Sequence, residues 1–140
     1  ISGRYEFKNK GIDVFIDAMG QLNRNNGLGK EVLAFILVPA GHAGANKELL
    51  HNLELPYQAV TSTDLYLTHY LNDSANDPVM NRIRAQKLRN SEEDKVKIFF
   101  VPSYLNGDDG VFNMPYYDLL VGMDLTAFPS FMKMQGINLL

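Results

Sequence analysis

The sequence has no cysteine, and only three of its 140 residues are histidines. Without cysteine there is no disulfide framework and no thiolate chemistry, which fits a cytoplasmic protein. His42, His51 and His69 stand far apart and lack the i, i+4 spacing of a helical metal site. We therefore expect the histidines to make local hydrogen bonds, and we expect no bound metal or other cofactor.

An excess of positive charge and a long apolar run are also missing. The net charge of -3 and the pI near 5.5 argue against the broad electropositive face that nonspecific nucleic-acid binding needs. No apolar run is long enough to span a bilayer, so a membrane partner is not expected. A hydrophobic content of 46% and a charged content of 21% are typical of one domain with an ordinary core.

The ends of the sequence are unusual. It opens in mid-strand without a methionine and stops after a tail with no regular pattern, residues 131–140. We interpret it as a piece of a longer protein, in which residues 1–130 form one incomplete lobe and residues 131–140 a divergent tail.

The first 22 residues combine a strand end, a cationic turn and an amphipathic helix. The turn carries Arg4, Lys8 and Lys10, and Gly11 precedes the helix. The expected apolar stripe of that helix consists of Val14, Phe15, Ala18, Met19 and Leu22. Cations beside a helix N-terminus favour an anion such as a phosphorylated ligand. The same spacing is equally compatible with a turn in which Lys8 and Lys10 are solvated and Arg4 lies over the sheet.

The remaining chain alternates predicted strands and helices. The apolar run at residues 31–39 is typical of a central strand in a parallel sheet. Further strands are predicted at residues 96–101 and 125–128, and helices at 46–55, from Asp77-Pro78 to about 90, and at 116–122. Residues 56–73 give no sustained period and are interpreted as an irregular or helical insertion.

This order predicts an α/β fold, a Rossmann-like open parallel sheet with helices on both faces. Ligands of such sheets bind at the carboxyl ends of the strands. Four segments should meet at that edge: residues 4–10, 39–43, 102–106 and 129–130.

Other candidate groups are ambiguous. Asp108 and Asp109 have the chemistry to bind a cation, but the turn-forming composition of residues 106–110 favours a role in a turn. Ser130 has no visible base. The arginines and lysine of the helix after Asp77 are expected to face solvent, because no aromatic platform for nucleic acid accompanies them. Tyr104, Tyr116 and Tyr117 suit either stacking on a base or ordinary packing.

Four stretches carry a resemblance to a known family: GRYEFKNKGIDVFIDAMGQLN, LTHYLNDSANDPVMNRIRAQKLRN, DKVKIFFVPSYLN and YYDLLVGMDLTAFPS. Together they resemble the glycogen synthases of the animal and fungal type, over residues 1–130. The resemblance implies the nucleotide-binding C-terminal lobe of a two-lobe retaining glycosyltransferase. It also implies that Arg4 and Lys10 hold the nucleotide diphosphate, that Tyr116 stacks on uracil, and that Tyr104 lines the base pocket.

The sequence departs from the family after AFPS. Lys133 stands where the family has its first catalytic glutamate, and the second would lie beyond the end. The resemblance therefore implies a fragment that is inactive by itself, from an enzyme that transfers glucose from UDP-glucose to the nonreducing end of an α-1,4-glucan, with homo-oligomers possible. Two alternatives stay open: a stand-alone nucleotide-sugar or phosphate-binding module, and a structural or partner-binding domain.

Overall fold

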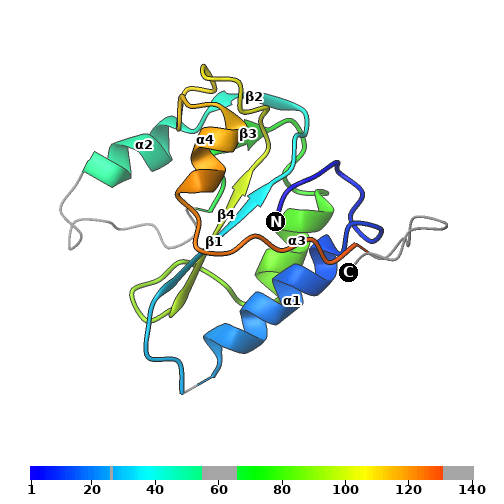
Figure 1. Ribbon diagram of the computed structural model, residues 1–140, viewed down its shortest axis with the longest axis vertical. Coiled ribbons are helices and arrows are strands. Elements are labelled where there is room, and N and C mark those ends of the chain that lie inside the picture. The colour runs from blue at the N-terminus through cyan, green and yellow to red at the C-terminus, as the bar shows by residue number, and fades with distance from the viewer. Residues whose placement is uncertain (26, 55–65, 131–140) are drawn as a thin grey trace.

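The computed structural model describes residues 1–25, 27–54 and 66–130 (Figure 1). Its architecture is α/β, as predicted, and is consistent with part of a Rossmann-like glycosyltransferase domain. The elements in chain order are α1 (Ile12–Asn23), β1 (Val32–Leu37), β2 (His42–Ala45), α2 (Lys47–Glu54), β3 (His69–Leu71), α3 (Pro78–Ala85), β4 (Val96–Val101) and α4 (Tyr116–Val121). No helix in these ranges is long and apolar enough to cross a membrane.

The centre of the fold is the parallel pair β1 and β4, both of which were predicted from their apolar runs. Their register runs from Val32 beside Val96 to Leu37 beside Val101. The side chains of Ala34 and Ile36 on β1 and of Ile98 and Phe100 on β4 are buried in one core. A segment before β3 lies along the other side of β4 through a parallel bridge between Leu67 and Phe100.

Helix α1 packs on this core, but its apolar stripe is rotated from the one predicted. The innermost residues are Ile12, Ile16 and Gly20, whereas Val14 is 48% exposed. Gly20 lies on this inner face, where a Cβ would lie 2.3 Å from Oε1 of Gln86. A glycine on a helix face permits close approach of a neighbouring element. Because glycine is not apolar, the hydropathy pattern does not identify this face as the buried one.

Helix α3 begins as predicted and ends earlier. Asp77 caps it by accepting the backbone N–H of Met80 at 3.0 Å, and Pro78 occupies the first turn. The helix stops at Ala85, and Lys87 has a positive φ of 58°. Arg82 is not simply solvated, as its sequence context had suggested, because its guanidinium forms a two-pronged ion pair with Asp17 of α1. This pair fastens α1 to α3.

Tyr5 ties the cationic turn to the body of the fold. Its hydroxyl donates to Oδ2 of Asp77 at 2.7 Å and accepts the N–H of Val79 at 3.3 Å. Its ring meets Phe100 edge-on at 6.1 Å. Burial and the adjacent Asp77 carboxylate raise the pKa of Tyr5 well above its usual value. The first loop is therefore anchored to α3 and β4 together.

Two strand predictions differ from the structure. Strands β2 and β3 form an antiparallel pair, whereas the sequence predicted no strand at either place. Residues 125–128, predicted as a strand, have no regular structure, and Leu125 is 84% exposed. The long loop at residues 102–115 and helix α4 agree with the prediction. Most of the predicted irregular insertion and the tail at 131–140 lie outside the described residues.

Candidate functional site

A pocket of about 590 Å³ opens at the carboxyl ends of β1 and β4. It is lined by Ser2, Gly3, Lys10, Leu37, Pro39, Ser103, Tyr104, Leu105, Asn106, Tyr116, Phe128 and Ser130. All four segments that the sequence placed at this edge contribute to the lining. The carboxyl ends of neighbouring parallel strands are where open α/β sheets bind their ligands.

The floor of the pocket depends on Gly11, which precedes α1. Gly11 has φ 67°, and a Cβ at this position would lie 1.9 Å from the carbonyl oxygen of Pro129. Beside it, Oγ of Ser130 donates to the carbonyl oxygen of Asn9 at 3.1 Å. The first loop and residues 129–130 are thereby held together, although they are distant in sequence.

Lys10 is the cation that lines the pocket. Its aliphatic stem passes over Gly3, where a Cβ would lie 3.8 Å from Cδ of Lys10. The ammonium is 3.8 Å from a carboxylate oxygen of Glu6, and both side chains are well exposed. Such a surface pair contributes little to stability, so the ammonium is free to exchange this partner for an anion.

Arg4 belongs to the same loop but is not part of the lining. Its residue is exposed, and within residues 1–25, 27–54 and 66–130 no ion pair of its side chain is found. The structure therefore brings together three of the four predicted site residues, Lys10, Tyr104 and Tyr116. The role of Arg4 stays a prediction.

Tyr116 lines the pocket from the start of α4. Its hydroxyl lies 2.5 Å from Oγ of Ser2, and its backbone N–H donates to Leu105 at 2.9 Å. Its ring meets that of Tyr117 edge-on at 5.3 Å. No sequence pattern predicts the contact with Ser2, because 114 residues separate the pair.

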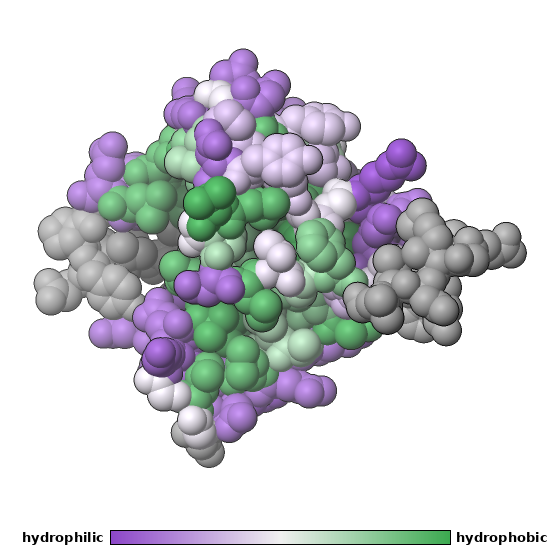
Figure 2. Space-filling model, in the orientation of Figure 1, coloured by the Kyte–Doolittle hydropathy of each residue, from purple (hydrophilic) through white to green (hydrophobic). Residues whose placement is uncertain are grey.

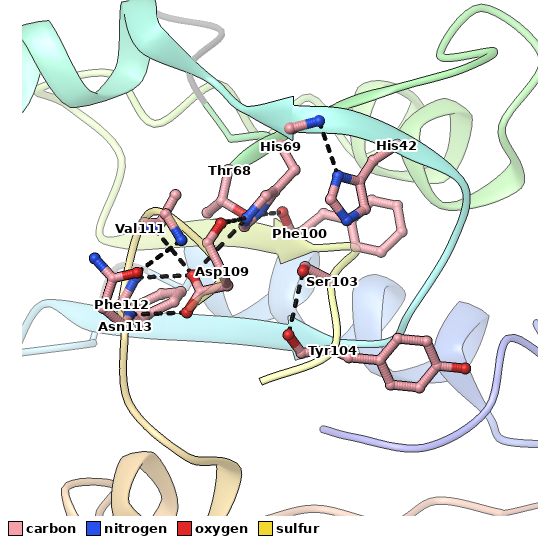
Figure 3. A network of polar contacts seen from close by, with 12 residues as sticks. His42, Thr68, His69, Phe100, Ser103, Tyr104, Asp109, Val111, Phe112 and Asn113 are labelled. Carbon is pink, nitrogen blue, oxygen red and sulfur yellow. Dashed lines mark hydrogen bonds and ion pairs between the residues drawn. The ribbon is translucent and has the colours of Figure 1, made fainter. Parts of the chain in front are cut away.

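Tyr104 lies at the rim and is 76% exposed. Its side chain points away from the polar cluster behind β4, as Figure 3 shows. An exposed aromatic ring beside an open pocket offers a flat apolar surface to a planar ligand.

A cluster of polar side chains, His42, Thr68, His69 and Asp109, holds the loop at residues 102–115 in place (Figure 3). The side chain of His69 is fully buried, with Nε2 2.7 Å from the backbone oxygen of Asp109 and Nδ1 2.8 Å from Oγ1 of Thr68. Because a carbonyl oxygen only accepts, Nε2 carries the proton in this contact. The local hydrogen-bonding role predicted for His69 is confirmed, but its partner 40 residues away was not foreseen.

Asp109 closes the loop with its carboxylate. The two oxygens accept the backbone N–H groups of Val111, Phe112 and Asn113 at 2.8 to 3.0 Å. Burial alone would raise the pKa of Asp109, but these N–H donors outweigh it and lower the pKa below its usual value. The predicted turn role of this carboxylate is confirmed.

His42 packs edge-on against His69 with ring centroids 4.8 Å apart. Its Nδ1 accepts the N–H of Gly44 at 3.0 Å. Burial, together with the neighbouring His69, lowers the pKa of His42. His42 thus packs on the histidine that holds the long loop.

The charge of the pocket is simple. Lys10 is its one charged lining residue, and no aspartate or glutamate is among the described residues that line it. Within the same described ranges, no group of three or more histidine, aspartate or glutamate side chains is placed to hold a metal ion. A cation beside exposed aromatic rings suits an anion joined to a planar ring.

Comparisons with known proteins point to one family. The family model described as "Glycogen synthase" matches residues 1–63 and 51–138. The chain is 29% identical to glycogen [starch] synthase isoform 2 of Saccharomyces cerevisiae, with 97% of the chain and 28% of the yeast protein covered. The chain is 27% identical to the glycogen [starch] synthase of Neurospora crassa, with 96% of the chain and 27% of that protein covered. It is 25% identical to the liver glycogen [starch] synthase of Rattus norvegicus, with 97% of the chain and 26% of that protein covered. The chain thus spans just over a quarter of the length of these curated relatives.

The alignments also locate a difference within the matched region. The alignment with the yeast isoform runs over 196 residues, whereas the chain has 140. The relative therefore contains additional residues inside this region. The two matches to the family model overlap at residues 51–63.

Proposed function

The chain belongs to the glycogen synthase family, and we propose that its pocket binds the UDP portion of UDP-glucose. In this proposal residues 1–130 are the nucleotide-sugar-binding lobe of an enzyme that transfers glucose to the nonreducing end of an α-1,4-glucan. The observation that carries the proposal is that Lys10 and Tyr116 line the same pocket at the ends of β1 and β4.

Each residue has a distinct part in the proposed binding. Lys10 faces the diphosphate, and Arg4 on the same exposed loop closes on it from outside the pocket. Tyr116 stacks on the uracil ring, and Tyr104 covers the base from the rim. Fixed cations at the diphosphate stabilise the negative charge that develops on the leaving UDP as the glycosidic bond breaks.

The proposal separates binding from catalysis. The described lining holds no carboxylate, and acid-base assistance needs a group within hydrogen-bond reach of the reacting atoms. We therefore assign binding to this chain and transfer to the whole enzyme. A lining without a carboxylate is also what the alternative predicts, a nucleotide-sugar or phosphate-binding module without catalysis.

The direct test is a calorimetric titration of UDP into the wild-type chain and Lys10→Ala. A charge-assisted phosphate contact contributes about 1.5 to 3 kcal/mol, so the variant should bind at least about tenfold more weakly. Lys8→Ala is the matched control, because Lys8 is an exposed lysine of the same loop that does not line the pocket. Equal affinities of the two variants for UDP would refute the phosphate assignment.

Replacing Tyr116 with alanine should weaken UDP more than inorganic pyrophosphate, because only UDP has a ring to stack. Stacking on an aromatic side chain contributes about 1 to 3 kcal/mol per base, so a loss of about five- to tenfold or more is expected for UDP. Tyr117→Ala serves as the control, since Tyr117 is exposed and outside the lining. If both ligands lose affinity equally, Tyr116 acts through the fold and not through stacking.

Incubation of the pure chain with labelled UDP-glucose and glycogen should give no incorporation above background. Catalysis requires reacting groups held in position around the transferred sugar, and the described lining of the pocket holds no carboxylate to act as such a group. Incorporation that rises with protein concentration would contradict the proposed division between binding and transfer.

A further inference from the structure

The hydrogen bond between Ser2 and Tyr116 joins two segments that line the pocket at the ends of β1 and β4. The two hydroxyl oxygens lie 2.5 Å apart, at the short end of the normal range for O–H···O bonds, and both residues belong to the lining. Either hydroxyl can donate, because serine and tyrosine are each a donor and an acceptor. The bond therefore engages the hydroxyl of Tyr116 within the protein itself.

The backbone around Ser2 is fixed to the sheet. Leu37 at the end of β1 donates its N–H to the carbonyl of Ile1 at 2.8 Å, and Gly3 donates to the carbonyl of Leu37 at 3.3 Å. Ser2 and Leu37 form a parallel bridge between these two bonds. A serine side chain has one heavy-atom torsion with three staggered positions, so a fixed backbone leaves its hydroxyl few places to lie. The end of β1 therefore sets the position of the Ser2 hydroxyl.

Helix α4, which carries Tyr116, is held less firmly than the sheet. It has six residues, none of them is buried, and Val121 at its end is 86% exposed. Figure 1 shows α4 at the surface of the molecule, and Figure 2 shows hydrophobic side chains gathered over the middle of the same face. Within residues 1–25, 27–54 and 66–130, the bond to Ser2 is the one side-chain hydrogen bond that α4 makes. A helix this short depends on such tertiary contacts.

Tyr116 is held at both ends of its side chain. Its backbone N–H donates to the carbonyl of Leu105 at 2.9 Å, and its hydroxyl bonds to Ser2. The ring of Tyr117 meets its ring edge-on at 5.3 Å. A tyrosine that is held at its backbone and at its hydroxyl keeps one direction of its long axis. Since the hydroxyl already has a partner, the flat apolar face of the ring is the surface left for a ligand.

We infer that Ser2 is a positioning residue of the proposed nucleotide site: its hydroxyl holds the Tyr116 ring in the orientation that the base meets. The ring then recognises the base by stacking and not through its own hydroxyl. The inference rests on the proposed function, because the base is the ligand that Tyr116 is proposed to stack on. A ring that is already in place avoids the cost of immobilising a side chain during binding, which corresponds to about a twofold to tenfold gain in affinity.

The first test needs no ligand and measures the side-chain torsions of the tyrosines by NMR. The three-bond couplings that report χ1 of Tyr116 should show one staggered rotamer in the wild-type chain and an average over rotamers in Ser2→Ala. Tyr104, which is 76% exposed, is the internal reference and should give averaged couplings in both chains. Averaged couplings for Tyr116 in the wild type, or one rotamer in Ser2→Ala, would overturn the inference.

The second test compares UDP with inorganic pyrophosphate by calorimetric titration. Ser2→Ala should bind UDP about twofold to tenfold more weakly than the wild type does. Its affinity for pyrophosphate should not change, because pyrophosphate has no ring to stack. Ser2→Thr keeps the hydroxyl and should restore the affinity for UDP. Ser91→Ala is the matched control, because it removes a serine hydroxyl that donates to Asp94 at 2.9 Å outside the pocket lining, and it should bind UDP as the wild type does.

A double-mutant cycle with Tyr116→Phe separates positioning from direct contact with the ligand. Ser2→Ala and Tyr116→Phe each remove one half of the same bond, so the two single variants should lose UDP affinity by a similar factor. The double variant should be no weaker than either of them, because the bond is lost only once. Either hydroxyl that touched UDP directly would make the losses add. Additive losses, or equal losses of UDP and pyrophosphate affinity in Ser2→Ala, contradict a positioning role.

These measurements also separate the inference from the proposed function. A wild-type chain that does not bind UDP would refute the proposed function and the part of Ser2 in it. UDP binding by the wild type that Ser2→Ala leaves unchanged would refute the inference alone and leave the nucleotide site in place. If Ser2→Ala does not fold, Tyr116→Phe removes the same bond from the other partner, and an unchanged affinity of that variant for UDP refutes the inference equally well.

Discussion

Gly11→Ala is expected to destabilise the fold by about 3 kcal/mol, as the sum of left-handed backbone strain and overpacking. The new Cβ would lie 1.9 Å from the carbonyl oxygen of Pro129, a distance at which something must shift. The contact between the first loop and residues 129–130 would have to open. Because Ser130 and Phe128 line the pocket, UDP binding should weaken in the same variant.

Two further substitutions separate the causes of this loss. Gly11→Asn relieves most of the backbone strain, since asparagine tolerates positive φ, but it keeps the Cβ that meets Pro129. It should therefore remain clearly destabilised. Gly29→Ala should leave the free energy of unfolding within about 0.5 kcal/mol, because no atom lies within 4 Å of its added Cβ. Wild-type stability of Gly11→Asn in denaturant unfolding would show that the contact with Pro129 is unimportant.

Asp109→Asn is expected to cost about 3 kcal/mol of stability at pH 7. The amide keeps one acceptor oxygen and turns an NH₂ group toward backbone N–H donors that now bond to a carboxylate, and hydrogen bonds to a charged group contribute about 1.5 to 3 kcal/mol each. Asp108→Asn makes the same charge change at the exposed neighbouring residue. It should change the free energy of unfolding by less than about 0.5 kcal/mol.

The loss at Asp109 should depend on pH in a defined direction. The folded-state pKa is lowered, so the carboxylate contributes its full stability above the unfolded-state pKa of about 3.9. That stability disappears as the pH falls through the folded-state value. The gap between wild type and Asp109→Asn should narrow on acidification below about pH 4, measured by denaturant unfolding. A gap that is unchanged down to the acid transition would contradict this account.

Local signals predicted the elements whose causes are local. The apolar run of β4 and the Asp77-Pro78 start of α3 are set by neighbouring residues, and both lie where the sequence placed them. The orientation of α1 is not local in this sense, because its inner face meets residues distant in sequence, such as Gln86 beside Gly20. Residues 125–128 have strand-forming side chains but no regular structure. No described strand pairs with them, and strand propensity alone does not form a strand.

The sequence predicted where the pocket lies, but it predicted only some of the side chains that line it. Parallel strands deliver their following loops to one edge, which is enough to bring Lys10, Tyr104 and Tyr116 to one pocket. Whether a side chain on a loop turns inward is decided by individual backbone bends, and Arg4 after the bend at Gly3 does not line the pocket. The support of the long loop by His69 rests on a contact across 40 residues that no spacing predicts.

The anchoring of Tyr5 has a consequence for the thermodynamics and speed of ligand capture. The loop that carries Lys10 is fixed to Asp77 and Phe100 in the chain without ligand. An anion that enters the pocket therefore orders little more than the side chains of Lys10 and Arg4, at an entropic cost of about 0.5 to 1.5 kcal/mol for each side chain. Association then needs no folding of the loop around the ligand, so its rate is governed by diffusion and orientation and not by a conformational step.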